Sequence, residues 1–145
     1  MVTVEVIKQL KLIHYSVQET DTLYAVKAWL PEDMSAIPIG KLGQFHFPKG
    51  YYVYAGSAKR NIRARVDRHL QIDKKKRWHI DYLRPYLQIE AVQTYPGLEG
   101  ECGLFQRLMR ENAGTMPVKG FGSSDCRCFS HLFYSGEEMP DFIGF

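Results

Sequence analysis

Residues 50–70, GYYVYAGSAKRNIRARVDRHL, decide the fold of this chain. An aromatic strand ends in the small residues 55–57, Ala-Gly-Ser, and a helix crowded with arginines follows directly. Backbone N–H groups at a helix start favour an anion, and Arg63, Arg65 and Arg68 add positive charge beside them. The stretch therefore predicts a surface that holds phosphate.

The charge of the chain is concentrated around this stretch. Among 145 residues there are 19 Lys or Arg and 16 Asp or Glu, which gives a net charge of +3. Between Lys59 and Arg84 there are ten basic and three acidic residues, so this window carries +7 and the rest of the chain −4. A focused patch favours a nucleic-acid backbone as partner. The alternative interpretation is a solvated helix face followed by a lysine-rich loop.

Length and composition predict one domain over residues 1–145, because 45% hydrophobic content is enough for a single core. Residues 1–21 are expected to form an N-terminal extension, 22–134 the core and 135–145 a tail. No apolar run approaches about 18 residues and no signal-peptide pattern opens the chain, which predicts a cytoplasmic protein without a membrane segment. Three cysteines do not make a disulfide framework, so reduced thiols are expected.

Hydrophobic periodicity and turn residues predict alternating strands and helices. Strands are expected at 23–30, 37–47 and 50–56 as an antiparallel meander, and later at 89–95 and 128–134. Helices are expected at 61–71, with Ile62, Val66 and Leu70 as its buried stripe, at 77–83, and at 99–112. Arg65, Arg68 and His69 would lie on other faces of the first helix. The order predicts an α+β domain with a small mixed or antiparallel sheet, a three-stranded core plus extra strands, flanked by helices.

Four polar residues on different elements could form a compact site: Tyr24, Tyr54, Arg65 and Glu101. Each alone is typical of packing or of a favourable helix-dipole contact. Together they supply hydroxyls that can orient a proton, a cation for developing phosphate charge, and a carboxylate that can hold a divalent metal ion. These groups are the parts of phosphodiester hydrolysis.

At these residues the sequence resembles the GIY-YIG nuclease superfamily, most closely its Uri-type branch, the domain of unknown function 123 family. TLYAV at 22–26 and YAG at 54–56 stand for the two halves of the name, although Thr22 and Leu23 replace the usual Gly and Ile. GYYVYAGSA, RVDRHL, KRWHIDYL and GFGSSDCRCFSHLFY are similar to features of that branch. The resemblance implies a small three-stranded core sheet and metal-dependent cutting of DNA.

The chain departs from the superfamily pattern at three places. Arg65 follows Gly56 by nine residues, one more than in the commoner pattern. The long separation of Tyr24 from Tyr54 predicts an inserted hairpin between the two halves. A late asparagine has no counterpart, and the GFGSSD loop, with Ser123, Ser124 and Asp125, occupies roughly its position.

The resemblance implies a role for each matching residue. Glu101 would hold one Mg²⁺ or Mn²⁺ against the scissile phosphate, Tyr24 would activate or orient the attacking water, and Arg65 would stabilise the transition-state charge. Tyr54 and His69 would orient water or contact the phosphate, with His69 also able to donate a proton. DNA is the expected partner, and the residues expected to bind it are Gly56, Ser57, Lys59, Arg60, Arg63, Arg68, Lys74, Lys75, Lys76 and Arg77.

Two further clusters contain side chains that could bind a metal ion. Cys126, Cys128 and His131, with Cys102 as a fourth ligand, could bind zinc, but one residue between two cysteines is not the usual zinc spacing, so buried thiols are favoured. His79 and Asp81 in WHIDYL are two apart on a predicted helix and face differently, and His79, which follows the basic residues 74–77, could equally contact phosphate. Trp78 is expected in the core, with stacking on an unpaired base as the alternative.

The leading hypothesis is therefore a metal-dependent endonuclease acting on DNA, in repair or processing. A non-catalytic nucleic-acid-binding module of the same fold is the alternative. A small-molecule phosphate or nucleotide binder is a third possibility, disfavoured because the chain lacks GxxxxGK[ST].

Overall fold

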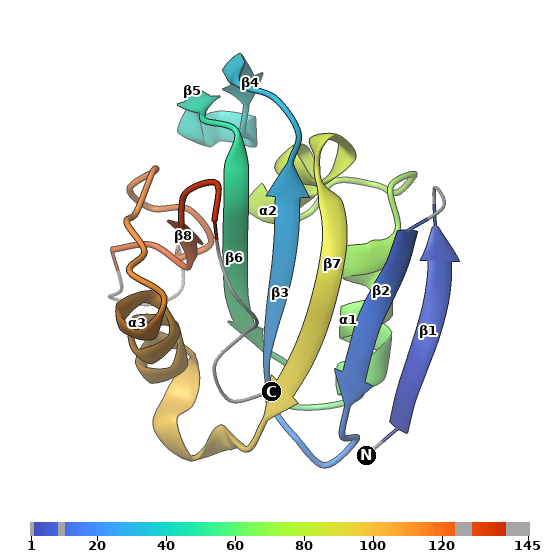
Figure 1. Ribbon diagram of the computed structural model, residues 1–145. Helices are drawn as coiled ribbons and strands as arrows, with labels where there is room; N and C mark the ends of the chain where they lie inside the picture. The colour runs from blue at the N-terminus through green and yellow to red at the C-terminus, as the bar shows by residue number, and fades with distance from the viewer. Residues whose placement is uncertain (1, 9–10, 124–128, 139–145) are drawn as a thin grey trace.

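The computed structural model describes residues 2–8, 11–123 and 129–138. Its main sheet has six strands in the order β1-β2-β7-β3-β6-β8, and β4 and β5 form a separate pair (Figure 1). The α+β prediction is confirmed. The strands are β1 (Val2–Lys8), β2 (Lys11–Val17), β3 (Leu23–Leu30), β4 (Met34–Pro38), β5 (Gln44–Phe47), β6 (Gly50–Ser57), β7 (Gln88–Tyr95) and β8 (Leu132–Tyr134). The α-helices are α1 (Ile62–Leu70), α2 (His79–Leu83) and α3 (Gly100–Glu111), with short 3₁₀ turns η1 (Gly40–Leu42), η2 (Arg84–Tyr86) and η3 (Gly97–Glu99).

The centre of the sheet is the predicted three-stranded core. Strand β3 pairs antiparallel with β6 on one side and with β7 on the other. Because side chains alternate along a strand, Tyr24 and Val26 enter one apolar cluster while Leu23 and Ala25 enter the cluster on the opposite face. Both faces of the core are therefore buried.

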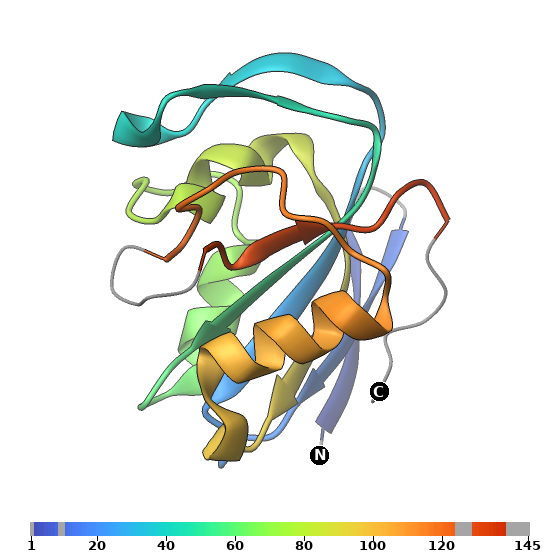
Figure 2. The same ribbon diagram turned by 90° about the vertical axis from the view of Figure 1, so that its left-hand side faces the viewer.

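Helices cover the two faces unequally. Helices α1 and α2 pack on the face that carries Tyr24 and Val26, and α3 crosses the other face (Figures 1 and 2). Helix α1 begins after Asn61, whose side chain accepts a hydrogen bond from the backbone N–H of Ala64, and it buries Ile62 and Val66 as predicted. The start of α1 and the end of β6 thus meet beside the sheet.

The expected meander is wrong in one respect. The segment before β6 does not enter the main sheet; β4 and β5 pair with each other and form an arm that extends from one end of it (Figure 2). Strand β6 instead pairs with β3 along all eight residues. The Asp33 carboxylate, which accepts a hydrogen bond from the Lys49 N–H at 2.6 Å, ties the base of the arm. This arm is the hairpin expected between the two halves of the motif.

The N-terminal residues join the main sheet. Strands β1 and β2 form an antiparallel hairpin, and β2 runs parallel to β7 through His14, Tyr15 and Ser16. The sequence analysis treated residues 1–21 as an extension outside the core. Parallel pairing with a strand more than seventy residues away leaves no local pattern, which explains the difference.

The remaining element boundaries differ from expectation by a few residues. Helix α2 begins at His79, and η2 continues the turn through Pro85. Strand β8 begins at Leu132, and residue 128 lies outside the described residues. Within the described ranges, no helix is both long enough and apolar enough to cross a membrane.

Candidate functional site

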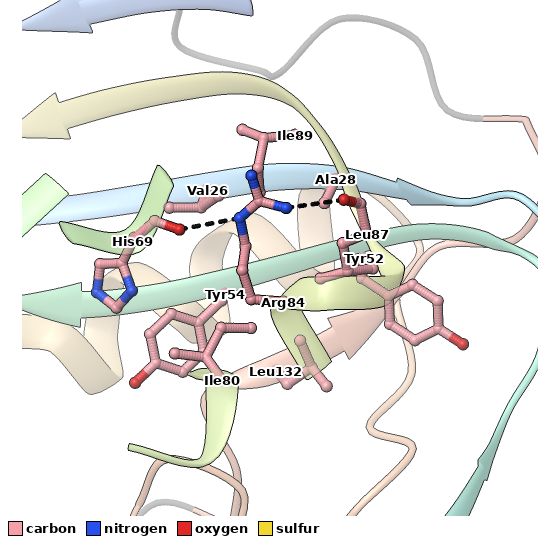
Figure 3. A pocket seen from close by; sticks show the side chains of 10 residues that line it. All are labelled: Val26, Ala28, Tyr52, Tyr54, His69, Ile80, Arg84, Leu87, Ile89 and Leu132. Carbon is pink, nitrogen blue, oxygen red and sulfur yellow. Dashed lines mark hydrogen bonds between the residues drawn. The ribbon is translucent and has the colours of Figure 1, made fainter. Parts of the chain in front are cut away.

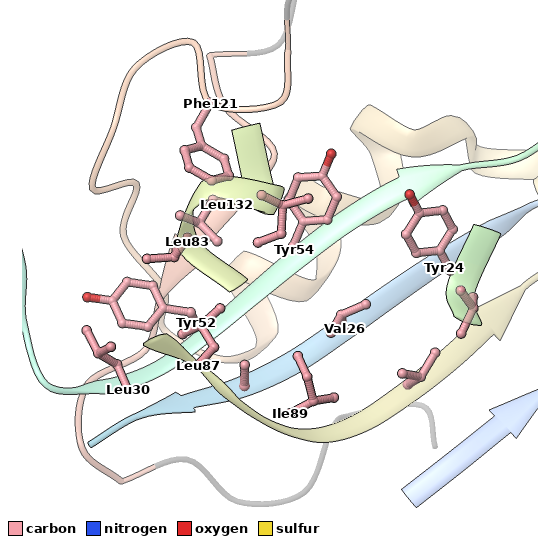
Figure 4. Packing of buried hydrophobic residues seen from close by; sticks show 14 of the residues in the cluster. Tyr24, Val26, Leu30, Tyr52, Tyr54, Leu83, Leu87, Ile89, Phe121 and Leu132 are labelled. Carbon is pink, nitrogen blue, oxygen red and sulfur yellow. The ribbon is translucent and has the colours of Figure 1, made fainter. Parts of the chain in front are cut away.

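Two tyrosines of the central strands point to the same side of the sheet. Tyr24 pairs with Gly56, and Val26 with Tyr54, so both phenols project from one face in diagonal positions. Figure 4 shows the two hydroxyls directed the same way, away from the apolar cluster. The rings belong to the core and only their polar ends reach the site.

Gly56 leaves the space that the Tyr24 ring occupies. A Cβ atom at Gly56 would collide with the Tyr24 hydroxyl oxygen and would lie 2.6 Å from the ring carbon Cζ. The glycine was expected to contact nucleic acid through its backbone. The structure gives it a definite packing role beneath Tyr24.

His69 lies behind Tyr24. Its Nε2 is 2.7 Å from the Tyr24 hydroxyl oxygen, and its side chain is only 3% exposed, so the expectation that His69 lies on an outer face of α1 is wrong. Burial, together with the nearby Lys74 ammonium, lowers the pKa of His69 to about 3. The imidazole is therefore neutral near pH 7, which does not favour it as a proton donor.

Arg65, the fourth residue of α1, reaches the cleft from the beginning of that helix. Its guanidinium donates a hydrogen bond to the Ser57 carbonyl at 2.9 Å and lies 4.7 Å from the centre of the Trp78 ring. The longer spacing between Gly56 and Arg65 is thus accommodated, because the arginine folds back to the end of β6.

Glu101 lies in the first turn of α3. Its Oε2 accepts a hydrogen bond from the Ser57 hydroxyl at 3.0 Å. Ser57 therefore contacts both charged residues: its carbonyl binds Arg65 and its hydroxyl binds Glu101.

A polar cleft of about 630 Å³ brings these groups together. Four of the five residues expected to be catalytic line it, and His69 lies beneath its floor. The lining residues are Tyr24, Tyr54, Gly56, Ser57, Lys59, Arg65, Arg77, Trp78, His79, Glu101 and Gly122.

Both phenols are protonated near neutral pH. Desolvation raises the pKa of Tyr24 to about 12, although the Arg65 guanidinium opposes this shift. Burial also raises the pKa of Tyr54 well above its ordinary value, and the neighbouring Tyr24 and Glu101 add to the effect. The cleft thus presents neutral tyrosine hydroxyls together with the Glu101 carboxylate and three cations, Lys59, Arg65 and Arg77.

The basic residues expected to bind DNA fall into two groups. Arg63 contacts Glu19, while Arg68 and Lys74 contact Asp81, so these three cations are already paired. The other five line the cleft or are exposed, and they form no salt bridge within the described part of the chain: Lys59, Arg60, Lys75, Lys76 and Arg77.

Arg84 also counts toward the predicted patch but is buried. Its guanidinium donates hydrogen bonds to the carbonyls of His69 and Leu87 (Figure 3) and also to that of Leu70. His69 and Leu70 lie at the end of α1. Arg84 satisfies carbonyls that the helix itself leaves unpaired. The charge available to a ligand is therefore smaller than the sequence count.

Asp81 fixes the basic loop before α2. Its carboxylate accepts hydrogen bonds from the Arg68 guanidinium and from the backbone N–H groups of Arg77 and Trp78. Burial alone would raise the pKa of Asp81, but these bonds outweigh it and hold the value at about 2. Asp81 is therefore a structural residue; from the sequence it was only disfavoured as part of a metal site with His79.

Three residues that line the cleft were not among the expected site residues: Trp78, His79 and Gly122. The His79 Nδ1 accepts a hydrogen bond from the Gly122 N–H at 2.8 Å. A Cβ at Gly122 would lie 2.8 Å from the Tyr54 ring, so this loop packs closely over the second phenol. The stretch KRWHIDYL, which contains Trp78 and His79, is the part of the sequence that could have pointed to both residues.

The structure corrects one of the expectations for the cysteines. Cys102 is disulfide-bonded, which corrects the expectation of reduced thiols. Cys126 and Cys128 of the weighed zinc site lie outside the described residues, as do Ser124 and Asp125. His131 is buried, with Nε2 3.5 Å from the Cys102 sulfur. Among the residues described, no group of three His, Cys, Asp or Glu side chains could hold a metal ion.

The late loop places Ser123 in packing. Its side chain is buried, and its hydroxyl lies 3.5 Å from the Phe129 carbonyl. It is not among the residues that line the cleft. Ser123 therefore does not take the place of the late asparagine.

The fold and the cleft together define a small α+β protein with a polar site at the junction of β6, α1, α2 and α3. The chain belongs to the family described as Domain of unknown function DUF123, whose family model matches residues 24–143. All of the cleft residues fall within that match. Searches of curated proteins and of solved structures found no match.

Proposed function

We propose that this protein is a metal-dependent endonuclease of the GIY-YIG type that hydrolyses phosphodiester bonds of DNA, in repair or processing. One observation supports the proposal most: two phenols, a guanidinium and a carboxylate, carried by β3, β6, α1 and α3, line one cleft. Exposed cations at its edge suit a polyanionic strand. The resemblance of the tyrosine motifs to that superfamily points the same way.

Glu101 is the residue that would hold the metal ion. Its Oε2 is bound by Ser57, and its Oε1 has no hydrogen-bond partner within the described ranges. Mg²⁺ commonly binds one or two carboxylates and completes its shell with water and substrate phosphate, so a single cleft carboxylate fits Mg²⁺ or Mn²⁺. When bound, the ion would neutralise charge on the scissile phosphate.

Tyr24 would orient the attacking water as a neutral phenol. The pKa of its hydroxyl is about 12 and that of the adjoining His69 about 3, so transfer of the phenol proton to the imidazole is strongly unfavourable. His69 instead fixes the direction of the Tyr24 hydroxyl through the 2.7 Å contact. Water held in this way is aligned for attack before it is deprotonated.

Arg65 would stabilise the charge that develops on phosphorus oxygens. Its guanidinium is anchored to the Ser57 carbonyl at the cleft wall, next to Glu101. A fixed cation placed where charge develops lowers the barrier without reorganisation. Tyr54 would add a second neutral hydroxyl donor on the same side.

Cleavage of labelled branched, nicked and single-stranded DNA with Mg²⁺ or Mn²⁺ tests the proposal. Glu101→Gln and Arg65→Ala should each lower the cleavage rate by about a hundredfold or more, because each removes a charge that the transition state needs. Glu111→Gln, at the far end of α3, is the control and should cut at the parent rate. Parent-like cleavage by folded Glu101→Gln would show the assignment to be wrong.

The alternative is a non-catalytic nucleic-acid-binding module. The observation in its favour is the burial of both phenols, which opposes ionisation of either. Such a module would bind DNA in a salt-sensitive way and leave it intact with every metal and substrate in the assay.

A further inference from the structure

Trp78 contacts two of the groups on which the proposed reaction depends. The guanidinium carbon of Arg65 lies 4.7 Å from the centre of the Trp78 ring, and the His69 ring centre lies 5.6 Å away. Trp78 also lines the cleft and is half-buried. The indole therefore contacts both the proposed charge-stabilising group, Arg65, and the residue that supports Tyr24, His69.

Arg65 needs a contact on the face of its guanidinium to have one orientation. Its side chain is long and partly exposed, and its hydrogen bonds to the Ser57 carbonyl and to the Tyr24 hydroxyl act at the edge of the guanidinium plane. Contacts at the edge leave the tilt of the plane free. The face of an aromatic ring attracts a guanidinium and restricts its orientation while leaving its in-plane N–H groups for a ligand.

Trp78 is itself held firmly. Its backbone N–H donates to the Asp81 carboxylate at 2.9 Å. The Arg68 guanidinium, which is bound by both oxygens of the same carboxylate, lies 4.3 Å from the ring centre. Asp81 thus fixes both the backbone of Trp78 and a cation packed on its ring.

We propose that Trp78 is a positioning residue that orients the Arg65 guanidinium toward the phosphate in the cleft. The consequence for catalysis rests on the proposed nuclease function, whereas the effect on the Arg65 side chain does not. Trp78 acts through Arg65, so removing the indole should matter only while the guanidinium is present. Because two other cations flank the ring, stacking of a nucleobase on it is the disfavoured role.

A double-mutant cycle tests the catalytic consequence. Trp78→Leu should lower kcat about tenfold with little change in KM, whereas Trp78→Phe, which keeps an aromatic face, should stay within about threefold of the parent. In the Arg65→Ala background, Trp78→Leu should cost no more than about twofold, since two residues that act as a unit are not additive. Tyr82→Leu, which removes an aromatic ring of the following helix α2, is the matched control and should keep the parent kcat.

Three outcomes would overturn the inference. An equal loss on Trp78→Leu with and without Arg65 would mean that Trp78 acts independently. A higher KM for single-stranded DNA at unchanged kcat would assign the ring to base stacking. Parent activity in Trp78→Leu would assign no role to it in the reaction.

A second measurement does not depend on cleavage. The side-chain Nε–Hε signal of Arg65, assigned by its loss in Arg65→Lys, should shift in Trp78→Leu and far less in Trp78→Phe, because the ring current and the orientation change together. The same signal should stay in place in Tyr82→Leu. An unmoved Arg65 signal in folded Trp78→Leu would refute the positioning, while absence of DNA cleavage by the parent would refute only the nuclease proposal.

Discussion

At the scale of single residues, the contact of Gly56 with Tyr24 shows how a core position controls a site. Gly56 lies opposite Tyr24 in the β3–β6 ladder, and its missing side chain gives the phenol the room to reach His69. The small residue of the YAG motif is therefore required by the position of a neighbouring hydroxyl. The Tyr24 hydroxyl oxygen, with which a Cβ at Gly56 would collide, is also the atom of this residue that faces the cleft.

Gly56→Ala should displace the Tyr24 ring and weaken its contact with His69. We expect a loss of about 1–3 kcal/mol in the free energy of unfolding, because the collision is with a packed ring near the strand backbone. Urea unfolding measures this loss. Gly103→Ala is the control: its Cβ would only touch Glu99 at 3.4 Å, and alanine favours the helix. Equal stability of Gly56→Ala and the parent would contradict the packing role.

The sequence predicted which residues form the site better than it predicted which residues lie next to them. Tyr24, Tyr54, Arg65 and Glu101 were expected together, and all four line the cleft. The burial of His69 could not be read from α1, because a histidine next to apolar Leu70 fits either face of the pattern. The place of Trp78 in the cleft depends on how the loop after α1 folds back, which no local spacing records.

At the scale of elements, the loop from Lys74 to Trp78 is held against α1 by one buried carboxylate. Asp81 pairs with Arg68 and Lys74, and the Lys74 side chain is only 5% exposed. A charge count treats these cations like the exposed ones. The pairing of these cations depends on three-dimensional contacts that the sequence does not record. The number of cations expected to be free to bind DNA was therefore too high.

Asp81→Asn should destabilise the fold near neutral pH by about 3 kcal/mol, since it leaves two cations around an uncharged group. The folded-state pKa of Asp81, about 2, lies below its ordinary value of 3.8. A carboxylate with a depressed pKa stabilises the fold above its unfolded-state pKa, and the effect is lost as pH falls from about 4 to 2. The difference between parent and variant should therefore shrink over that interval.

Urea unfolding at several pH values from 7 to 2 measures this difference. Asp73→Asn, an exposed aspartate in the same loop, is the control and should follow the parent throughout. If the difference in the free energy of unfolding between the parent and Asp81→Asn stays constant down to pH 2, the charge of Asp81 has no role in stability.

At the scale of the whole molecule, the antiparallel core and the three helices followed from sequence, and the edges of the sheet did not. The short apolar run of β3, which ends before Pro31, and the helical repeat of apolar positions in α1 made these two elements predictable. The VTVEVIK stretch alternates, but its place in the sheet depends on β2 pairing with the distant β7. Pairing between strands so far apart in the sequence is determined by contacts in the folded core.

The distribution of unpaired cations over the molecule predicts how DNA binding responds to salt. Lys75, Lys76 and Arg77 are exposed and Arg77 lines the cleft, whereas Arg63 is paired with Glu19. Each phosphate contact contributes about 0.9 to the slope of log K against log salt on duplex DNA. Replacing all three exposed residues with glutamine should therefore reduce the slope by about 2 to 3.

Fluorescence anisotropy of a labelled oligonucleotide at several salt concentrations gives this slope without any cleavage, if metal is omitted. Arg63→Gln is the matched control, because its guanidinium already satisfies a carboxylate and should leave the slope unchanged. An unchanged slope in the triple variant, or an equal reduction in Arg63→Gln, would mean that DNA does not approach the cleft from the side of the Lys74–Trp78 loop.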